Sequence, residues 1–287
     1  MKKFKKICVV GKYRSGDAMS PIYKLIEFLM QQKIGVSIDS DTAQQLSLSN
    51  VESGPLNEVV SGSDLTVVVG GDGTMLSLAR TVADLNVPLL GINLGRLGFL
   101  ADISLARMVE SLSAVLNGEY VSDERLLLEA NISSSNGPGI LALNDISISK
   151  GYGGGLMQMK VTIDGKLAYN LRADGLVVST PTGSTAYALS AGGPIIAPSV
   201  ECILLVPVCP HTLSNRPIVV PSSSRIEIMV TDASDARLHI DSHSHLDVEE
   251  GERLTIKYTE KRVCLLHPAG HDYYNTLREK LRWAGTM

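Results

Sequence analysis

One short segment constrains the fold of this chain more than any other: Val67–Val69 lead directly into Gly-Gly-Asp-Gly-Thr at residues 70–74. Three consecutive valines predict a strand that is covered on both faces. The glycines let the backbone turn sharply and leave main-chain N–H groups open to a phosphate. Thr74 stands where a helix cap is expected, ahead of apolar residues at helical spacing. A strand, a glycine turn and a helix N-terminus together predict an anion site.

Asp72 is the unusual member of this turn, because a phosphate repels a carboxylate unless a cation or a transferable proton lies between them. The pairing therefore favours phosphoryl transfer over simple phosphate binding. Asp72 could accept a proton from an attacking hydroxyl, which is the role we prefer, or it could hold Mg²⁺. One carboxylate alone is a poor metal site, so we expect no metal held by the protein itself. A plain strand-to-helix turn is the alternative interpretation.

The predicted elements indicate two architectures in one chain. Strands and helices alternate over residues 1–119, which predicts an α/β domain with a mostly parallel, Rossmann-like sheet that carries the phosphate donor and the catalytic turn. Short strands dominate residues 120–270 and predict an all-β, sandwich-like domain, with a hairpin turn at Asp164-Gly165. Residues 271–287 are expected to form a terminal amphipathic helix. In the first part we expect strands at Ile7–Val10, Val36–Ile38, Leu65–Val69 and Pro88–Ile92, and helices at Ile22–Gln32, Thr74–Leu85 and Leu105–Leu116.

Composition excludes several classes of protein. The 287 residues carry a formal net charge of −4, which argues against a nucleic-acid-binding protein. No secretory signal precedes Cys8, and the uncharged stretch Gly175–Val200 is too rich in Thr, Ser, Gly and Pro for a good membrane span. The cysteines show no CxxC spacing. We therefore expect a cytoplasmic protein with reduced thiols that binds neither nucleic acid nor membrane.

A second polar segment runs from Asp174 to Tyr187. Its predicted strand ends at Ser179, and five hydroxyl side chains follow each other through a turn shaped by Pro181 and Gly183. Hydroxyls and exposed N–H groups suit the sugar and amide edges of a polar ligand, although a surface loop rich in Ser and Thr is the alternative. The pair Asn144-Asp145 could bind a base edge or ribose hydroxyls, but such a pair is more often a turn.

These motifs together resemble NAD kinases. The Gly-Gly-Asp-Gly-Thr turn, Asn144-Asp145, Asp174–Tyr187 and Pro210–Pro217 occur in the order seen in that family, and the last two segments resemble its bacterial members especially. The resemblance spans nearly the whole chain. It implies transfer of the γ-phosphate of ATP to the 2′-hydroxyl of the adenosine ribose of NAD, which gives NADP and regulates the intracellular balance of NAD and NADP. It also implies a homodimer or homotetramer and a divalent cation, Mg²⁺ or Mn²⁺, carried mainly by the nucleotide phosphates.

The resemblance also assigns roles to residues. Asp72 would be the catalytic base, and Gly73 would lie against the dinucleotide. Asn144 and Asp145 would hold the adenosine of NAD in the β-rich domain, while Arg172 and Asp174 would face its nicotinamide side. The other residues expected to bind substrate or nucleotide are Gly71, Thr74, Thr182, Thr185, Ala186, Tyr187, Ala188, Leu189, Ser190 and His243.

His239, Asp241, His243 and His245 alternate along one predicted strand and so share one face. A metal site is one interpretation of this pattern. Ligands from a single strand seldom converge without residues from elsewhere, however, so we favour a ligand-facing His243 in the dinucleotide pocket. Many relatives carry glutamine at that position.

Two other functions stay open at this point. Lipid kinases of the diacylglycerol or sphingosine type share a Gly-Gly-Asp-Gly turn and a two-domain plan, and a non-catalytic module that responds to NAD(P) is a third interpretation. The segment Thr182–Tyr187 and the pair Asn144-Asp145 favour the dinucleotide over a lipid. Asp72 argues against a non-catalytic binding protein, because a carboxylate next to the phosphates would repel them and gain nothing for binding alone.

Overall fold

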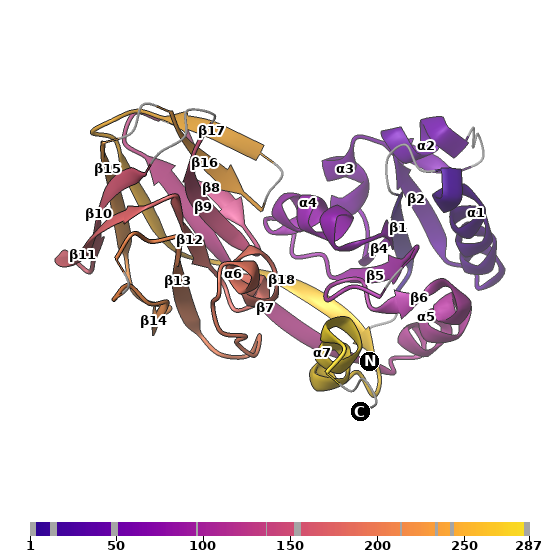
Figure 1. Cartoon of the computed structure of the whole chain (residues 1–287). Coiled ribbons are helices and arrows are strands. Elements are labelled where there is room, and N and C mark those ends of the chain that lie inside the picture. The colour runs from indigo at the N-terminus through magenta and orange to yellow at the C-terminus, as the bar shows by residue number, and fades with distance from the viewer. Residues whose placement is uncertain are drawn as a thin grey trace. The chain divides into compact units, whose positions relative to one another are not determined.

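The computed structural model describes residues 4–11, 16–46, 51–95, 97–135, 137–151, 156–212, 214–232, 235–241 and 244–283. The chain divides into two compact units (Figure 1). Unit 1 comprises Met1–Glu124 and Val263–Met287, and unit 2 comprises Arg125–Arg262. The end of the chain thus belongs to unit 1, and so do residues 263–270, which the sequence analysis grouped with the β-rich segment.

Unit 1 is built on a parallel sheet whose strands lie in the order β5-β4-β1-β2-β3. The strand bounds are β1 Lys6–Gly11, β2 Gly35–Asp39, β3 Glu52–Gly54, β4 Leu65–Gly70 and β5 Leu89–Asn93. Short β6 (Ile103–Ser104) also pairs with β5. The end of β18 (Arg253–Pro268) returns to unit 1 and pairs in parallel with β5 at Leu265 and Leu89.

Helices cover both faces of this sheet, as the alternation of elements predicts. They are α1 Gly16–Gln31, α2 Ser40–Leu46, α3 Leu56–Ser61, α4 Asp72–Val82 and α5 Met108–Leu116, the last preceded by a 3₁₀ turn at Leu105–Arg107. Fully buried Leu25 of α1 and Leu112 of α5 share one core with Val67 and Val69. Figure 1 shows α3 and α4 on the opposite side of the sheet. The predicted α/β fold of this part is confirmed.

Unit 2 consists of two antiparallel sheets. One has the order β14-β13-β12-β9-β16-β17, and the other contains β11, β10, β15 and β18. The bounds are β8 Ile140–Ala142, β9 Asp145–Lys150, β10 Met157–Ile163, β11 Lys166–Ala173, β12 Gly175–Ser179, β13 Cys202–Val208, β14 Ile218–Pro221, β15 Ile226–Asp232, β16 Ala236–Ile240 and β17 Ser244–Val248. Long β7 (Tyr120–Ile132) pairs with β18 and β8.

Side chains from both sheets pack together in one shared core between them. Val161 and Ile228 come from one sheet, and Ile148, Val178 and Ile203 come from the other. The predicted sandwich is therefore confirmed. The predicted hairpin turn is confirmed as well, because Asp164 and Gly165 join β10 to β11 with φ angles of 51° and 75°.

Several short elements differ from the sequence-based expectation. Sequence periodicity did not predict four elements of seven residues or fewer, because so short a segment gives little periodicity to detect: α2, β3, α3 and β17. Residues 253–268 form one long strand, β18. The C-terminal helix α7 spans Tyr273–Leu281, and Asp272 caps it by accepting the N–H of Tyr274. No helix in the described part of the chain is long and apolar enough to cross a membrane.

Candidate active site

The glycine turn in unit 1 joins β4 to α4. The helix begins at Asp72 with Gly71 as its N-cap, so the expectation that Thr74 caps the helix is wrong. Thr74 instead folds back on the turn: a Cβ atom on Gly70 would lie 2.5 Å from its Oγ1. A Cβ on Gly71 would meet no described atom within 4 Å. Glycine is thus needed at residue 70 for packing, whereas residue 71 leaves the start of the helix open to a ligand.

Three main-chain N–H groups hold the carboxylate of Asp72. Phe99 donates to Oδ2 at 2.9 Å, while Leu100 and Ala101 donate to Oδ1 at 3.0 and 3.1 Å. The loop closes tightly, since a Cβ on Gly98 would lie 2.0 Å from Asp72 Oδ1. The carboxylate is therefore held in one orientation at the start of α4. Sequence reasoning did not identify this loop.

A cavity of about 220 Å³ opens beside this turn. Gly70, Gly71, Asp72, Asn93 and Lys280 are among the residues that line it. Lys280 comes from α7, and its ammonium lies 5.5 Å from the centre of the Phe99 ring. A helix N-terminus and a cation on one cavity attract an anion such as a phosphate. Sequence reasoning missed Lys280 because it is far from the turn along the chain.

In unit 2, Asp241 organises the pair Asn144-Asp145. Its carboxylate accepts the N–H groups of Leu143, Asn144 and Asp145 at 3.1, 2.8 and 3.2 Å. Asp241 has a φ of 48°, a left-handed conformation that Asp tolerates better than most residues. The carboxylate thus fixes the backbone where β9 begins, and the side chain of Asn144 stays half-buried and accessible.

The carboxyl group of Asp145 is buried without full compensation. Its side chain is 2% exposed, and Oδ1 has no hydrogen-bond partner among the described residues. Burial, and then the charge of Asp241, raise the pKa of Asp145 to about 7. Burial and then the charge of Asp145 also raise the pKa of half-buried Tyr187. Asp145 and Tyr187 therefore lie within electrostatic range of each other, and Asp145 Oδ1 is a buried acceptor without a donor among the described residues.

Most hydroxyls of the segment 179–185 hold the protein itself together. Ser179, Thr180 and Ser184 are fully buried and donate to the main-chain oxygens of Asn144, Leu143 and Pro181 at 3.2, 2.6 and 2.6 Å. The expectation that five hydroxyls face a ligand is therefore wrong for these three residues. Their bonds tie this segment to the Asn144-Asp145 turn. Thr182 accepts a bond from Arg125 Nη1 at 3.2 Å, and Thr185 donates to the carbonyl of Thr182 at 3.3 Å.

The other expected residues of unit 2 differ in accessibility. Arg172 and Asp174 have exposed side chains next to the start of β12. Ala186, Tyr187 and Leu189 are half-buried and Ser190 is exposed, so each can meet a ligand. Ala188 is fully buried against Val177, Leu204 and Val206, so its side chain belongs to the core. His243 and most of the glycine-rich loop 151–155 lie outside the described residues.

The alternating histidines on β16 and β17 do not gather around a common point with Asp241. His239 faces His245 across the two strands with ring centres 6.2 Å apart, and its Nε2 lies 3.1 Å from Ser149 Oγ. Asp241 is engaged with the N–H groups of residues 143–145. The geometry thus gives no support for a metal site built from these described residues.

Comparison with known proteins decides the family. The model of the ATP-NAD kinase N-terminal domain matches residues 7–120, and that of the ATP-NAD kinase C-terminal domain matches residues 143–267. The chain belongs to the ATP-NAD kinase family. The NAD kinase of Nitrosospira multiformis is 46% identical over 98% of this chain and 97% of its own length. The NAD kinase of Thiobacillus denitrificans is 45% identical with the same coverage.

Two solved structures of the kinase family share this fold. Yeast NADH kinase complexed with NADH has a TM-score of 0.91 and 26% identity, and the match covers 100% of this chain and 89% of that one. An NAD kinase from Archaeoglobus fulgidus in complex with ATP has a TM-score of 0.76 and 27% identity, covering 96% and 98%. The predicted resemblance to NAD kinases is therefore confirmed, which removes the lipid-kinase family as an alternative.

The buried carboxyl of Asp145 makes a prediction about pH. The pKa rises from 3.8 to about 7 on folding, so the folded protein keeps a proton that the unfolded chain has already lost. This contribution to stability is complete below about pH 4 and is lost as the pH rises to about 7. Asp145→Asn removes the titrating group, so we expect its melting temperature to rise relative to wild type between about pH 5 and about pH 8.

Thermal unfolding of both proteins at the two pH values measures this difference. Glu250→Gln, which removes one negative charge from an exposed side chain, is the control. A gap between Asp145→Asn and wild type that does not change with pH would contradict the burial argument.

Proposed function

We propose that this chain transfers the γ-phosphate of ATP to the 2′-hydroxyl of the adenosine ribose of NAD and so forms NADP. Membership of the ATP-NAD kinase family supports the reaction. One structural observation carries the assignment of the chemistry: the Asp72 carboxylate is held by three main-chain N–H groups at the start of α4, beside a cavity with a helix N-terminus and Lys280. Phosphoryl transfer needs this combination of a positioned base and an anion site.

The donor phosphates would bind at the glycine turn. The open side of Gly71 and the N–H groups of the first turn of α4 give main-chain donors, and Gly73 and Thr74 belong to the same turn. Lys280 would neutralise phosphate charge at this cavity. The related Archaeoglobus fulgidus enzyme in complex with ATP supports this nucleotide as the donor.

Asp72 is proposed to act as the general base. The 2′-hydroxyl loses its proton to the carboxylate as its oxygen bonds to the γ-phosphorus, and the bond from that phosphorus to the bridging oxygen breaks, so that ADP leaves with the electron pair. The N–H groups of Phe99, Leu100 and Ala101 fix the direction of the carboxylate. Positioning of this kind is the main means by which a protein accelerates phosphoryl transfer.

The surroundings of Asp72 do not resemble a metal site that the protein builds by itself. Both carboxylate oxygens already accept main-chain N–H bonds. In the described part of the chain, the single cluster of three potential metal ligands is elsewhere, at Asp102. We therefore infer that the divalent cation, Mg²⁺ or Mn²⁺, enters as a complex with the phosphates of ATP and is part of the substrate.

The dinucleotide would bind mainly to the segment with residues 120–270, whereas residues 1–119 would carry the donor. Asn144 and Asp145 are proposed to hold the adenosine, since Asn144 is accessible and Asp145 Oδ1 needs a polar partner. Arg172 and Asp174 would contact the nicotinamide side. The other residues proposed to line this pocket are Thr182, Thr185, Ala186, Tyr187, Leu189 and Ser190. The complex of yeast NADH kinase with NADH supports a dinucleotide in this fold.

Asp72→Asn tests the role of the base. We expect a rate lower by about 10²–10⁴-fold, because an amide cannot accept the proton. Binding of NAD, measured by calorimetry, should persist. The assay follows NADP formation from ATP and NAD, with diacylglycerol in place of NAD as a second arm. Asp84→Asn, at an exposed site just beyond α4, is the matched control. A rate close to that of wild type would overturn the assignment, and phosphorylation of the lipid would overturn the substrate class.

Gly98→Ala tests the loop that positions the base. A methyl group there would lie 2.0 Å from Asp72 Oδ1, so the loop or the carboxylate must move. We expect kcat to fall by at least about tenfold, with a smaller change in the KM for NAD, because the ground-state contacts of the substrate are elsewhere. Gly62→Ala meets only ordinary contacts of 3.5 Å or more and is the control. Unchanged kcat in Gly98→Ala would show that the loop does not position Asp72.

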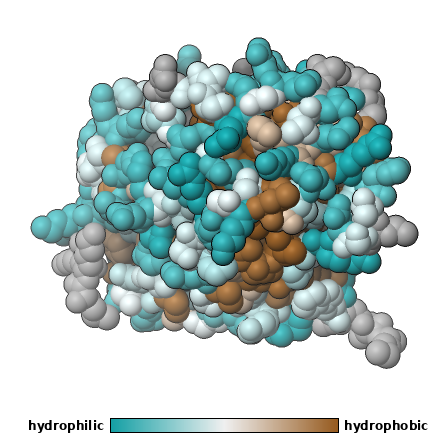
Figure 2. Space-filling model, turned by 90° about the vertical axis from the view of Figure 1, so that its left-hand side faces the viewer, coloured by the Kyte–Doolittle hydropathy of each residue, from teal (hydrophilic) through white to brown (hydrophobic). Residues whose placement is uncertain are grey.

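We also infer that the enzyme is a homo-oligomer. Figure 2 shows an apolar patch on the side of unit 2 that carries β10, β11 and β14. Leu167 of β11 is 54% exposed and Val219 of β14 is 51% exposed, and both strands end their sheets. Exposed apolar patches and free sheet edges commonly mark interfaces.

Leu167→Lys should therefore weaken the assembly and shift the mass measured by light scattering after size-exclusion chromatography towards the monomer. Val200→Lys, at a similarly exposed site outside these strands, should leave the mass unchanged. An equal mass for wild type and Leu167→Lys would place the interface elsewhere.

A further inference from the structure

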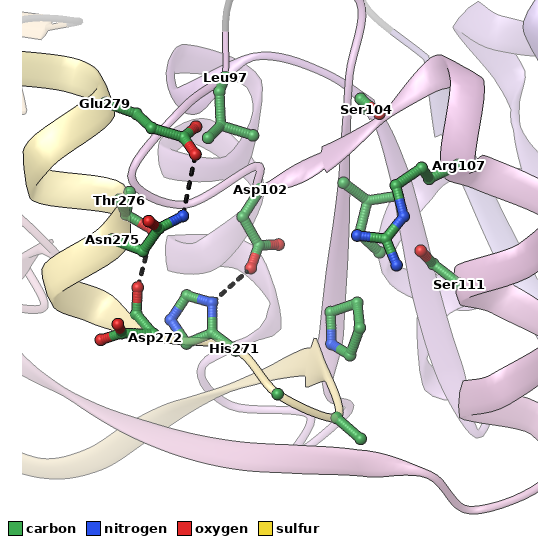
Figure 3. A pocket seen from close by; sticks show the side chains of 14 residues that line it. Leu97, Asp102, Ser104, Arg107, Ser111, His271, Asp272, Asn275, Thr276 and Glu279 are labelled. Carbon is green, nitrogen blue, oxygen red and sulfur yellow. Dashed lines mark hydrogen bonds and ion pairs between the residues drawn. The ribbon is translucent and has the colours of Figure 1, made fainter.

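The carboxylate of Asp102 and the imidazoles of His267 and His271 lie together inside unit 1, and none of them takes part in the proposed reaction. Asp102 follows the loop that holds Asp72, His267 lies near the end of β18, and His271 lies in the turn before α7. The Nδ1 atoms of His267 and His271 are 2.8 and 2.9 Å from the same oxygen, Asp102 Oδ2. The two rings stack with centres 4.0 Å apart. Figure 3 shows the His271 ring directed at the Asp102 carboxylate.

The three side chains of this cluster are largely withdrawn from water. The side chains of His267, Asp102 and His271 are 1%, 6% and 17% exposed. Asp102 Oδ1 has no hydrogen-bond partner within the described part of the chain. A buried carboxylate with one uncompensated oxygen attracts a cation.

We propose that Asp102, His267 and His271 bind a divalent transition-metal ion of the Zn²⁺ type, at a site separate from the ATP-bound cation. Imidazole nitrogen and carboxylate oxygen are ligands that such ions prefer, and three protein ligands suffice for a zinc site with an open position. The three donor atoms lie within 4.8 Å of one another, and no other group of three such side chains does so among the residues that the structure describes. Zinc bonds of about 2.0–2.1 Å need donor separations about half an ångström wider than these hydrogen bonds, and one of the two stacked rings must turn so that both Nδ1 lone pairs meet at the ion.

The surroundings supply what a metal site needs beyond its ligands. When Nδ1 of His267 binds the ion, the proton of the neutral ring resides on Nε2, which lies 3.7 Å from Asp123 Oδ2. A carboxylate behind a ligating histidine is typical of metal centres, and a shift of a few tenths of an ångström would bring Asp123 within hydrogen-bond distance of this nitrogen. Asp102 and His271 also line a cavity of about 390 Å³, through which water can reach the open coordination positions (Figure 3).

The bound ion would connect three segments of unit 1. Asp102 directly follows Ala101, whose N–H group holds Asp72, while His267 and His271 belong to the returning end of the chain. The alternative is a plain hydrogen-bond network, in which one carboxylate oxygen accepts two imidazole N–H groups. The two possibilities differ in whether the full-length protein takes up zinc.

Calorimetric titration of the chelator-treated full-length protein with Zn²⁺ separates them. We expect one ion per chain with a dissociation constant of about 1 μM or below. His271→Gln removes one ligand and should weaken binding by at least about 100-fold, whereas the control His245→Gln, an exposed histidine on β17, should bind zinc as wild type does. No uptake by wild type, or equal affinity in His271→Gln, would overturn the proposal.

Diffraction from wild-type crystals soaked in Zn²⁺ gives a test that does not depend on folding of a variant. We expect an anomalous peak at the zinc absorption edge between the Asp102 carboxylate and the two Nδ1 atoms. An empty cluster, or a peak elsewhere in the chain alone, would contradict the assignment.

Discussion

Three hydrogen bonds from the backbone of residues 99–101 to the carboxylate of Asp72 are the contact on which the arrangement of the glycine turn after β4 depends. The parallel pairing of β4 with β5 brings the two strand ends together, so that the turn after β4 and the loop after β5 can meet. Gly98 allows this approach because any side chain would collide with Asp72. The sheet, the glycines and the loop thus set the direction of a single acidic side chain.

Asp72, Asp241 and Asp145 carry the same carboxyl group, but their surroundings in the fold give them different properties. Asp72 and Asp241 each accept three main-chain N–H bonds, and each shapes the loop around it. Asp145 is buried with one oxygen unpaired, and its pKa is raised to about 7 by burial and by Asp241. A ligand that donates to Asp145 would relieve that cost, so under the proposed function part of the binding energy for the dinucleotide would arise at this carboxyl group.

Local patterns predicted what depends on neighbours along the chain. The run Val67–Val69 predicted a buried strand, and Asp164-Gly165 predicted a hairpin, because sterics and periodicity act within a few residues. The hydroxyls of Ser179, Thr180 and Ser184 were misjudged because sequence does not reveal whether a hydroxyl bonds to a ligand or to a main-chain oxygen. Lys280 and the Asp102 cluster were missed because β18 brings the end of the chain back to unit 1. The spacing of residues along the sequence does not predict such a long-range pairing.

A crystal structure of the enzyme with NAD and a non-hydrolysable ATP analogue tests the central assignment most directly. We expect an Asp72 carboxylate oxygen within about 2.6–3.2 Å of the ribose 2′-oxygen, with that oxygen in line with the γ-phosphorus. The N–H bonds from residues 99–101 should persist in the complex. A 2′-oxygen that contacts another side chain while Asp72 bonds only to its loop would contradict the account.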